Sequence, residues 1–268
     1  MLKTLHTLFL ATLLVPSTAL AQATAFHYNA KRLPIGTVLQ YAKSNLDGTN
    51  ASNIDVYVRD KKEVESFKAW HEPATRATLV RAQMDWERFS VSGFQVFDLE
   101  CGQPPQARAS LEVRPQEFRV SFLDQPIPLT HALWHSYDFD FTSLSLAMTM
   151  LRNPRSSFEI WRSDAVFEPM GFAEMGAVTL AYQASEDHLG RATRRYSIGG
   201  PGLRDTTGTW WADAKTGTLV AYEIPIPDEP GYKDVRFELR NVARMNDREW
   251  EAHKHATLCK ASPAPHAP

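Results

Sequence analysis

The sequence has no excess of charge of either sign. Lysine and arginine number 29, aspartate and glutamate number 31, and the formal net charge is −2, with the two signs interspersed along the chain. A protein that binds nucleic acid needs a basic stripe to neutralise phosphates, and anionic membranes attract clusters of basic residues. The composition therefore predicts no nucleic-acid partner and no electrostatic attachment to a membrane.

The common catalytic signatures are also missing. The chain contains no Gly-x-Ser-x-Gly, Ser-x-x-Lys, His-Glu-x-x-His, Walker or Gly-x-Gly-x-x-Gly motif. These motifs place a nucleophile, a metal ion or a phosphate group. We therefore expect no catalytic residue and no cofactor, although a triad scattered over distant strands would leave no such trace in a sequence.

Cysteine is scarce. Cys101 and Cys259 are the two in the chain, and no Cys-x-x-Cys redox motif occurs. An even number of distant cysteines in an exported protein favours one structural bridge. We expect a Cys101–Cys259 disulfide, with two buried thiols as the alternative.

Long hydrophobic runs are absent after the first residues. Lys3 precedes the apolar run 8–15, which is shorter than the about 20 residues that cross a bilayer but fits the core of a signal peptide. Ala19-Leu-Ala21 supplies the small residues of a cleavage site. We expect residues 1–21 to be a cleaved signal peptide, Gln22 to begin the mature chain, and the protein to be periplasmic or secreted without a membrane span. An uncleaved N-terminal anchor is the alternative.

What the sequence has in abundance is period-two alternation of apolar and polar residues. Residues 107–114 are apolar at every odd position and polar at every even one, as in a strand with one buried face. Turn residues such as Asp47-Gly48 and Lys215-Thr-Gly217 separate the patterns. Similar patterns occur at 36–43, 54–58, 64–70, 80–86, 91–99, 118–122, 157–162, 178–182, 194–198, 207–212, 217–224 and 235–239.

These patterns predict the fold class. Strands that follow one another every 10 to 15 residues without helices between them are joined as antiparallel hairpins. We expect a mainly β protein with a large curved antiparallel sheet, an open barrel or hook, and one or two helices on its concave side. A two-sheet sandwich is the alternative. Residues 22–260 would form a single β-rich domain, and the Pro-rich residues 261–268 a disordered tail.

One segment, residues 128–154, breaks the β pattern and predicts a helix. A helix that is apolar on two faces is buried on both, or buried on one and in contact with an apolar ligand on the other. Asn153-Pro154 would end this helix. We predict that Phe141, Leu144 and Met148 contact an apolar ligand. The first apolar face holds Phe141, Leu144, Met148 and Leu151, and the second holds Leu146 and Met150.

Adjacent tryptophans mark a second candidate. Neighbouring residues on a strand point to opposite faces of the sheet, so Trp210 and Trp211 cannot both face the core. We predict that Trp211 faces outward or into a concave ligand surface. Carbohydrate stacking is the rival explanation of this residue.

Two polar clusters offer alternatives to a pure binding role. His131 and His135 share a helix face at metal-ligand spacing, and Asp138 and Asp140 follow closely. The block 186–195 combines Glu186, Asp187 and His188 with three arginines, as an anion site or a solvated hairpin tip would. His253 and His255, near the C-terminus, would lie on one side of a strand or in solvent.

The stretch Trp211-Ala-Asp-Ala-Lys-Thr-Gly-Thr-Leu-Val220 resembles a hairpin of the bacterial periplasmic lipoprotein carriers with the LolA/LolB-like β-hook. A Trp and an Asp precede a Gly turn and an apolar return strand, and the long meander with an inserted apolar helix adds to the likeness. The resemblance implies an open half-barrel whose concave face is plugged by helices and can hold acyl chains.

Together these features predict an exported, non-catalytic binder or carrier of a lipid or other apolar ligand. The first alternative is an envelope structural or assembly factor with a protein partner and a filled concave face. The second is a hydrolase or metal-dependent enzyme built on the 131–140 His/Asp cluster.

Overall fold

A computed structural model describes residues 25–259 except 71–74, 115–116, 122, 124, 129–130, 132–140, 168–169 and 228–229. The expected signal peptide and the Pro-rich tail lie outside the described residues.

The strands of the described chain belong to one sheet. Every pairing between neighbouring strands is antiparallel, and hairpins or short connections join most of them. The fourteen strands are β1 (Thr37–Ser44), β2 (Ser52–Val58), β3 (Glu63–Trp70), β4 (Arg76–Asp85), β5 (Ser90–Glu100), β6 (Gln106–Val113), β7 (Glu117–Val120), β8 (Ile127–Pro128), β9 (Phe158–Phe167), β10 (Met170–His188), β11 (Arg191–Gly200), β12 (Thr206–Asp213), β13 (Leu219–Ile224) and β14 (Val235–Arg244).

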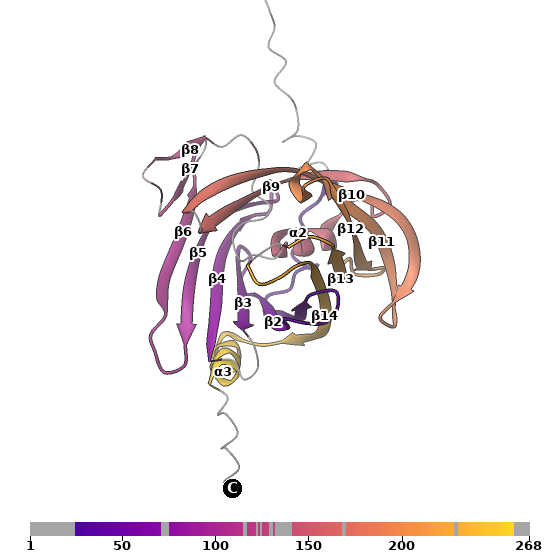
Figure 1. The fold of residues 1–268 in the computed structure, drawn as a ribbon. Coiled ribbons are helices and arrows are strands. Elements are labelled where there is room, and N and C mark those ends of the chain that lie inside the picture. The colour runs from indigo at the N-terminus through magenta and orange to yellow at the C-terminus, as the bar shows by residue number, and fades with distance from the viewer. Residues whose placement is uncertain are drawn as a thin grey trace, which may run out of the picture.

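The strand order shows that the sheet is open and does not form a closed barrel. β1 pairs with β2 on one side and with the last strand, β14, on the other, from Thr37 opposite Arg244 to Ser44 opposite Arg236. The order is therefore β8 to β1 followed by β14 to β9, with β8 and β9 at the two edges. Figure 1 shows this sheet curved around a central space. The predicted curved antiparallel sheet is confirmed.

Alternation assigns the side chains to the two faces. In β2, Ile54, Val56 and Val58 join the large core on the concave side, whereas Tyr57 packs with a smaller cluster on the convex side. The same rule operates in β12, where Trp210 belongs to the concave core and Trp211 to a small cluster on the other face. The concave side therefore holds the main hydrophobic core.

A short helix lies inside the curve of the sheet, as Figure 1 shows. It consists of α2 (Thr142–Ala147) and a 3₁₀ turn, η1 (Met148–Met150). All six residues of α2 are buried. The prediction of a helix from the segment around 141–151 on the concave side is confirmed. A second 3₁₀ turn, η2 (Pro201–Leu203), follows β11.

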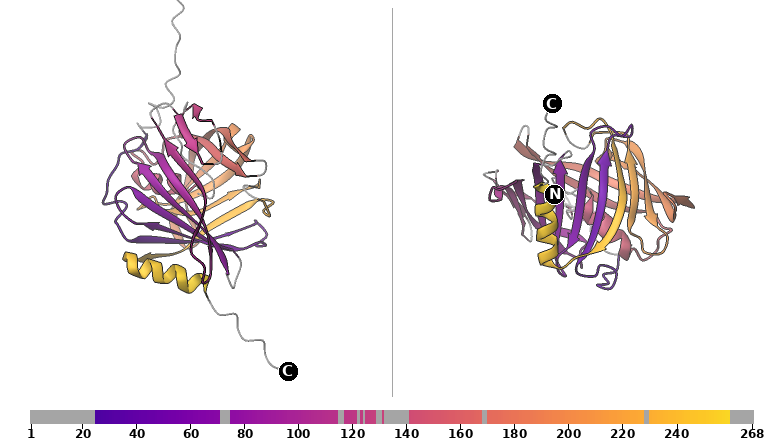
Figure 2. Two further views of the ribbon diagram at one scale, coloured as in Figure 1. Left: turned by 90° about the vertical axis from the view of Figure 1, so that its left-hand side faces the viewer. Right: turned by 90° about the horizontal axis from the view of Figure 1, so that it is seen from below.

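The helix α3 (Asp247–Leu258) packs outside the sheet, against the convex face (Figure 2). Trp250 and Leu258 bury against Tyr57 and Phe67 of the strands beneath. This corrects the strand placement expected for His253 and His255: both lie on α3, where His253 is half-buried and His255 is exposed to solvent. The helix forms because Asn246 caps it and Glu249 completes a capping box.

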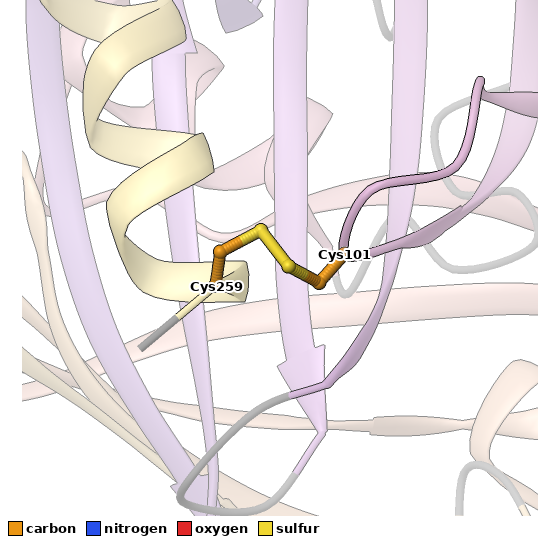
Figure 3. Close-up of a disulfide and its surroundings, with 2 residues drawn as sticks. All are labelled: Cys101 and Cys259. Atoms are coloured by element: carbon orange, nitrogen blue, oxygen red, sulfur yellow. A yellow bond between two sulfur atoms is a disulfide. The ribbon is translucent and has the colours of Figure 1, made fainter. Parts of the chain in front are cut away.

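A disulfide fixes the end of α3. Cys101 and Cys259 are bonded, with their Cα atoms 5.2 Å apart and 158 positions between them in the chain. Figure 3 shows the bond joining the C-terminal end of the helix to the turn after β5. The predicted pairing is confirmed.

Among the described residues, no helix is long and apolar enough to cross a membrane.

Candidate functional site

A row of aromatic side chains crosses the concave wall of the sheet. Trp210 lies opposite Tyr222, which in turn lies opposite Phe237. Their rings stack with centroids 5.6 Å and 5.0 Å apart, and each of the three side chains is at most 1% exposed. Tyr196 extends the row on the β11 side, and Lys43 continues it on β1, opposite Phe237. Four aromatic side chains on neighbouring strands therefore line this part of the concave wall, with Lys43 at the end of the row.

The phenols of this interior are neutral. Burial raises the pKa of Tyr196 to about 12 and drives the pKa of Tyr41 still further above its ordinary value of 10.0. The Tyr196 hydroxyl donates to the carbonyl of Pro154 over 2.6 Å. These groups contribute no negative charge to the concave wall at any physiological pH.

Phe141 connects the helix α2 to this wall. Its ring meets those of Trp210 and Tyr222 edge to face, with centroids 6.3 Å and 5.9 Å apart. Leu144 and Met148 belong to the same core cluster and are 0% and 3% exposed. The structure thus brings together three of the residues that the sequence indicated for ligand contact. Leu146 and Met150, on the second apolar face, are buried in that cluster as well.

The first turn of α2 contains two unfavourable local features. Phe141 takes a left-handed conformation, with φ of 55°, and no side chain caps the helix. Such a backbone costs about 1–2 kcal/mol in a residue with a Cβ. The hydroxyls of Thr142 and Ser143 are buried without a hydrogen-bond partner, and an unsatisfied buried group costs about 1–3 kcal/mol. This end of the helix therefore stores unfavourable free energy.

The other end of the helical segment is held firmly. The carbonyl of Met150 accepts a hydrogen bond from the backbone of His27 over 3.0 Å, and Leu151 forms a β-bridge with Phe26. Gly217, in the β12–β13 turn, lies so close that a Cβ there would be 2.6 Å from the Met148 carbonyl oxygen. The segment is anchored at η1, and its unfavourable local features lie at the Phe141 end.

Beside Phe141 is a small cavity of about 10 Å³, lined partly by a buried arginine. Arg162 of β9 is 5% exposed, and its guanidinium lies 5.6 Å from the centre of the Phe141 ring. Its Nη1 donates to the carbonyl of Gly202 over 3.2 Å, while its Nε has no partner. The other lining residues are Leu203, Tyr222, Ile224, Ile226, Pro227 and Val235.

The connection between β13 and β14 closes this side of the interior. Ile226 and Pro227 line the cavity, and Tyr232 lies over the ammonium groups of Lys43 and Lys68, 4.8 Å and 5.6 Å from its ring centre. Hydrogen bonds hold the connection to the β1–β2 turn, from Leu46 N to Asp234 Oδ1 and from Lys233 N to Asn45 Oδ1. The connection thus covers the concave face next to Arg162.

Trp211 lies away from this site. Because it follows Trp210 on the strand, it faces the opposite side of the sheet. Its indole N–H donates to Glu186 over 2.8 Å, and its ring stacks on His188 with centroids 4.0 Å apart. Arg195 pairs with the same Glu186 over 3.2 Å. The 186–195 block and Trp211 therefore form one polar and aromatic cluster on the convex face, and a ligand role for Trp211 stays a prediction.

The possible metal cluster lies mostly outside the described residues, which omit His135, Asp138 and Asp140. His131 stacks on Trp161 with ring centroids 3.7 Å apart. Within the part of the chain that the structure describes, no three His, Cys, Asp or Glu side chains are grouped so that they could hold a metal ion.

Sequence reasoning missed Arg162. In β9 it occupies the same face as Phe158 and Ile160, which belong to the concave core. A charged residue in phase with the apolar positions of a strand breaks the expected alternation, and this break was the available signal. Lys43, in phase with Leu39 and Tyr41, gives the same signal in β1.

Comparison with known proteins did not identify a family for this chain. No family model matches it, and no curated protein matches it significantly.

Proposed function

We propose that the protein is an exported, periplasmic or secreted, non-catalytic binder or carrier of a lipid or other apolar ligand. The ligand enters the concave interior of the sheet and takes the space of α2. A disulfide between distant cysteines is typical of oxidising compartments outside the cytosol. The resemblance of residues 211–220 to the lipoprotein carriers supports the same function.

The observation that carries the proposal is the unfavourable first turn of α2, which lies against an aromatic wall. Phe141 is in a left-handed conformation and the hydroxyls of Thr142 and Ser143 are unsatisfied, yet the helix is apolar and buried. A helix kept only to fill a core gains nothing from these defects, because each lowers the stability of the folded state. A helix that must leave the interior needs a small free-energy difference between its two positions.

The size of the cavity explains why α2 must move. The space beside Phe141 is about 10 Å³, room for one water-sized group, whereas pockets for drug-sized ligands measure about 300–1,000 Å³. A chain-like ligand at this place therefore needs the volume that Phe141, Leu144 and Met148 fill. The Phe141 ring packs on the aromatic row, and Leu144 and Met148 belong to the same core cluster. A ligand chain would replace these side chains with similar apolar contacts.

The burial of α2 favours a second function. Every residue of the helix is buried, and Leu144, Leu146 and Ala147 are each 0% exposed. A permanently filled interior suits an envelope structural or assembly factor, which would contact a protein partner through its surface. The two functions differ in whether α2 ever leaves the sheet.

Native mass spectrometry distinguishes the two. The mature protein is purified without detergent from the compartment to which it is exported, and its intact mass is compared before and after extraction with organic solvent. A binder retains apolar molecules that the solvent releases, and the stripped protein then takes up a neutral fluorescent probe, N-phenyl-1-naphthylamine, at micromolar concentration. A bare polypeptide mass together with no probe binding would overturn the binding function and leave the assembly factor.

A further inference from the structure

The buried cation Arg162 defines the class of ligand. We infer that Arg162 binds the acidic head of the apolar ligand, which is accordingly a long-chain carboxylic acid rather than a neutral lipid. This inference rests on the proposed function, since it concerns the same concave site.

The hydrogen bonding of Arg162 leaves a donor for a ligand. A guanidinium carries five N–H donors. Nη1 donates to Gly202, and Nη2 lies 3.6 Å from Asp164 Oδ2, farther than a hydrogen bond. Nε is buried and has no partner. Arg162 is thus paired with Asp164 and hydrogen bonded to Gly202, and the unmet group is the buried Nε donor, which is unfavourable without an acceptor. A ligand carboxylate would supply that acceptor.

The position of the guanidinium suits a ligand with one acidic end and one apolar end. The group stands at the margin of the aromatic row, 5.6 Å from the ring centre of Phe141 and in a cavity whose other lining residues are largely apolar. A carboxylate held there would direct its chain along Tyr222, which Phe141 contacts, and on to Phe237, which stacks on Tyr222. Head and chain would then be recognised by adjacent parts of one wall.

Asp164 limits the charge of that head. Its carboxylate lies within salt-bridge distance of the same guanidinium, so a doubly charged phosphate would meet stronger repulsion than a singly charged carboxylate. This repulsion favours a carboxylic acid.

The test compares hexadecanoic acid with hexadecan-1-ol, which has the same chain and no charge. Each is titrated against the mature protein loaded with N-phenyl-1-naphthylamine, and displacement gives its affinity. A charge-assisted hydrogen bond in a buried site corresponds to about tenfold or more in affinity. The acid should therefore bind about tenfold or more tightly than the alcohol. In Arg162→Met the acid should fall to the affinity of the alcohol, while the alcohol itself is unchanged.

Two further variants control this result. Arg240→Met removes the same charge from a side chain that is 61% exposed, and it should leave both affinities unchanged. Arg162→Lys keeps the charge but loses the planar donor fork, so it should retain part of the preference for the acid. Should Arg162→Met fail to fold in a thermal melt, the acid-to-alcohol ratios of the wild type and Arg162→Lys decide the question.

Equal affinities of acid and alcohol for the wild type, or an equal loss of both in Arg162→Met, would overturn the inference and leave the proposed binding function intact. If neither ligand nor the probe binds the wild type, both the inference and the proposed function fail.

Discussion

Gly217 and Met148 touch backbone to backbone: a Cβ on Gly217 would lie 2.6 Å from the Met148 carbonyl oxygen. This contact joins the β12–β13 turn to the end of the helical segment in the interior. It is the point at which the hairpin that resembles the lipoprotein carriers meets the helix proposed to move. The anchored end of that helix is therefore built into the sheet, and movement would begin at Phe141.

Replacing this glycine should destabilise the protein through two separate effects. Gly217→Ala places a Cβ at φ of +78° and against the Met148 carbonyl, so we expect a loss of about 2–4 kcal/mol in the free energy of unfolding. Gly190→Ala is the matched control, since its φ is +71° and nothing lies within 4 Å of a Cβ there. It should cost about 1–2 kcal/mol. If urea unfolding gives equal losses of stability for Gly217→Ala and Gly190→Ala, the close approach of residue 217 to Met148 does not contribute to stability.

Removing an unsatisfied hydroxyl should strengthen the seating of α2. In Ser143→Ala the buried oxygen without a partner disappears, and we expect a gain of about 1 kcal/mol. A ligand must then displace a more stable helix. The apparent affinity of the variant protein for the probe N-phenyl-1-naphthylamine should therefore fall about fivefold. Ser145→Ala is the control: its hydroxyl donates to the carbonyls of Phe141 and Thr142, so its loss should not stabilise the helix. A Ser143→Ala protein that is less stable than the wild type contradicts this account.

Most of the sheet could be predicted from the sequence, because alternation is a local property of each strand. The pattern at 107–114 became β6 and the pattern at 54–58 became β2. β8 escaped prediction because two residues are too few to show a period. The pairing of β1 with β14 joins segments about 200 positions apart, and no local pattern encodes such a contact.

The helix α3 and Arg162 were missed for different physical reasons. In α3 only a few residues, chiefly Trp250 and Leu258, reach the core, so its apolar stripe is thin and its main sequence signal is the cap from Asn246 to Glu249. Arg162 is charged, and charged residues usually point to solvent. Its burial depends on its contacts with Gly202 of η2 and the Phe141 ring, which are far from it in the sequence or set by tertiary packing.

A buried carboxylate should make the stability of the protein sensitive to acid. Glu65 is 0% exposed and accepts hydrogen bonds from Trp250 over 2.6 Å and Lys254 over 3.1 Å. Burial alone would raise the pKa of Glu65, but the charge of Lys254, the hydrogen bond from Trp250 and the charge of Arg59 outweigh it and hold the pKa below its usual value of 4.5.

A carboxyl group whose pKa is lowered by folding stabilises the protein above its unfolded pKa and loses that effect as the pH falls through the folded pKa. We expect Glu65→Gln to cost about 3–5 kcal/mol at pH 7, because Lys254 and Arg59 then lack a buried counter-charge. This difference from the wild type should shrink below pH 4.5. Glu112→Gln, which breaks only an exposed pair with Arg114, should cost less than about 1 kcal/mol. Urea unfolding between pH 3 and 7 measures all three proteins, and a pH-independent difference would be the contrary result.

The disulfide should stabilise the protein in two ways. It restricts the unfolded chain, and it fixes the C-terminal end of α3. With 158 positions between the cysteines, the loop-entropy model sets an upper bound of about 5 kcal/mol. We expect reduction of the wild type to lower the free energy of unfolding by a few kcal/mol within that bound. The Cys101→Ser, Cys259→Ser protein should have the reduced stability with or without reductant. Identical unfolding of the oxidised and reduced wild type would argue that α3 is held by its other contacts alone.

The central claim is that an apolar ligand takes the place of α2, and hydrogen exchange tests it most directly. Exchange of the amides of residues 144–149 is followed by mass spectrometry with and without saturating hexadecanoic acid, with the amides of α3 as the internal reference. The account predicts faster exchange in 144–149 when ligand is bound and no change in α3. Unchanged or slower exchange in 144–149 at saturation would contradict it, because the helix would then remain where it lies.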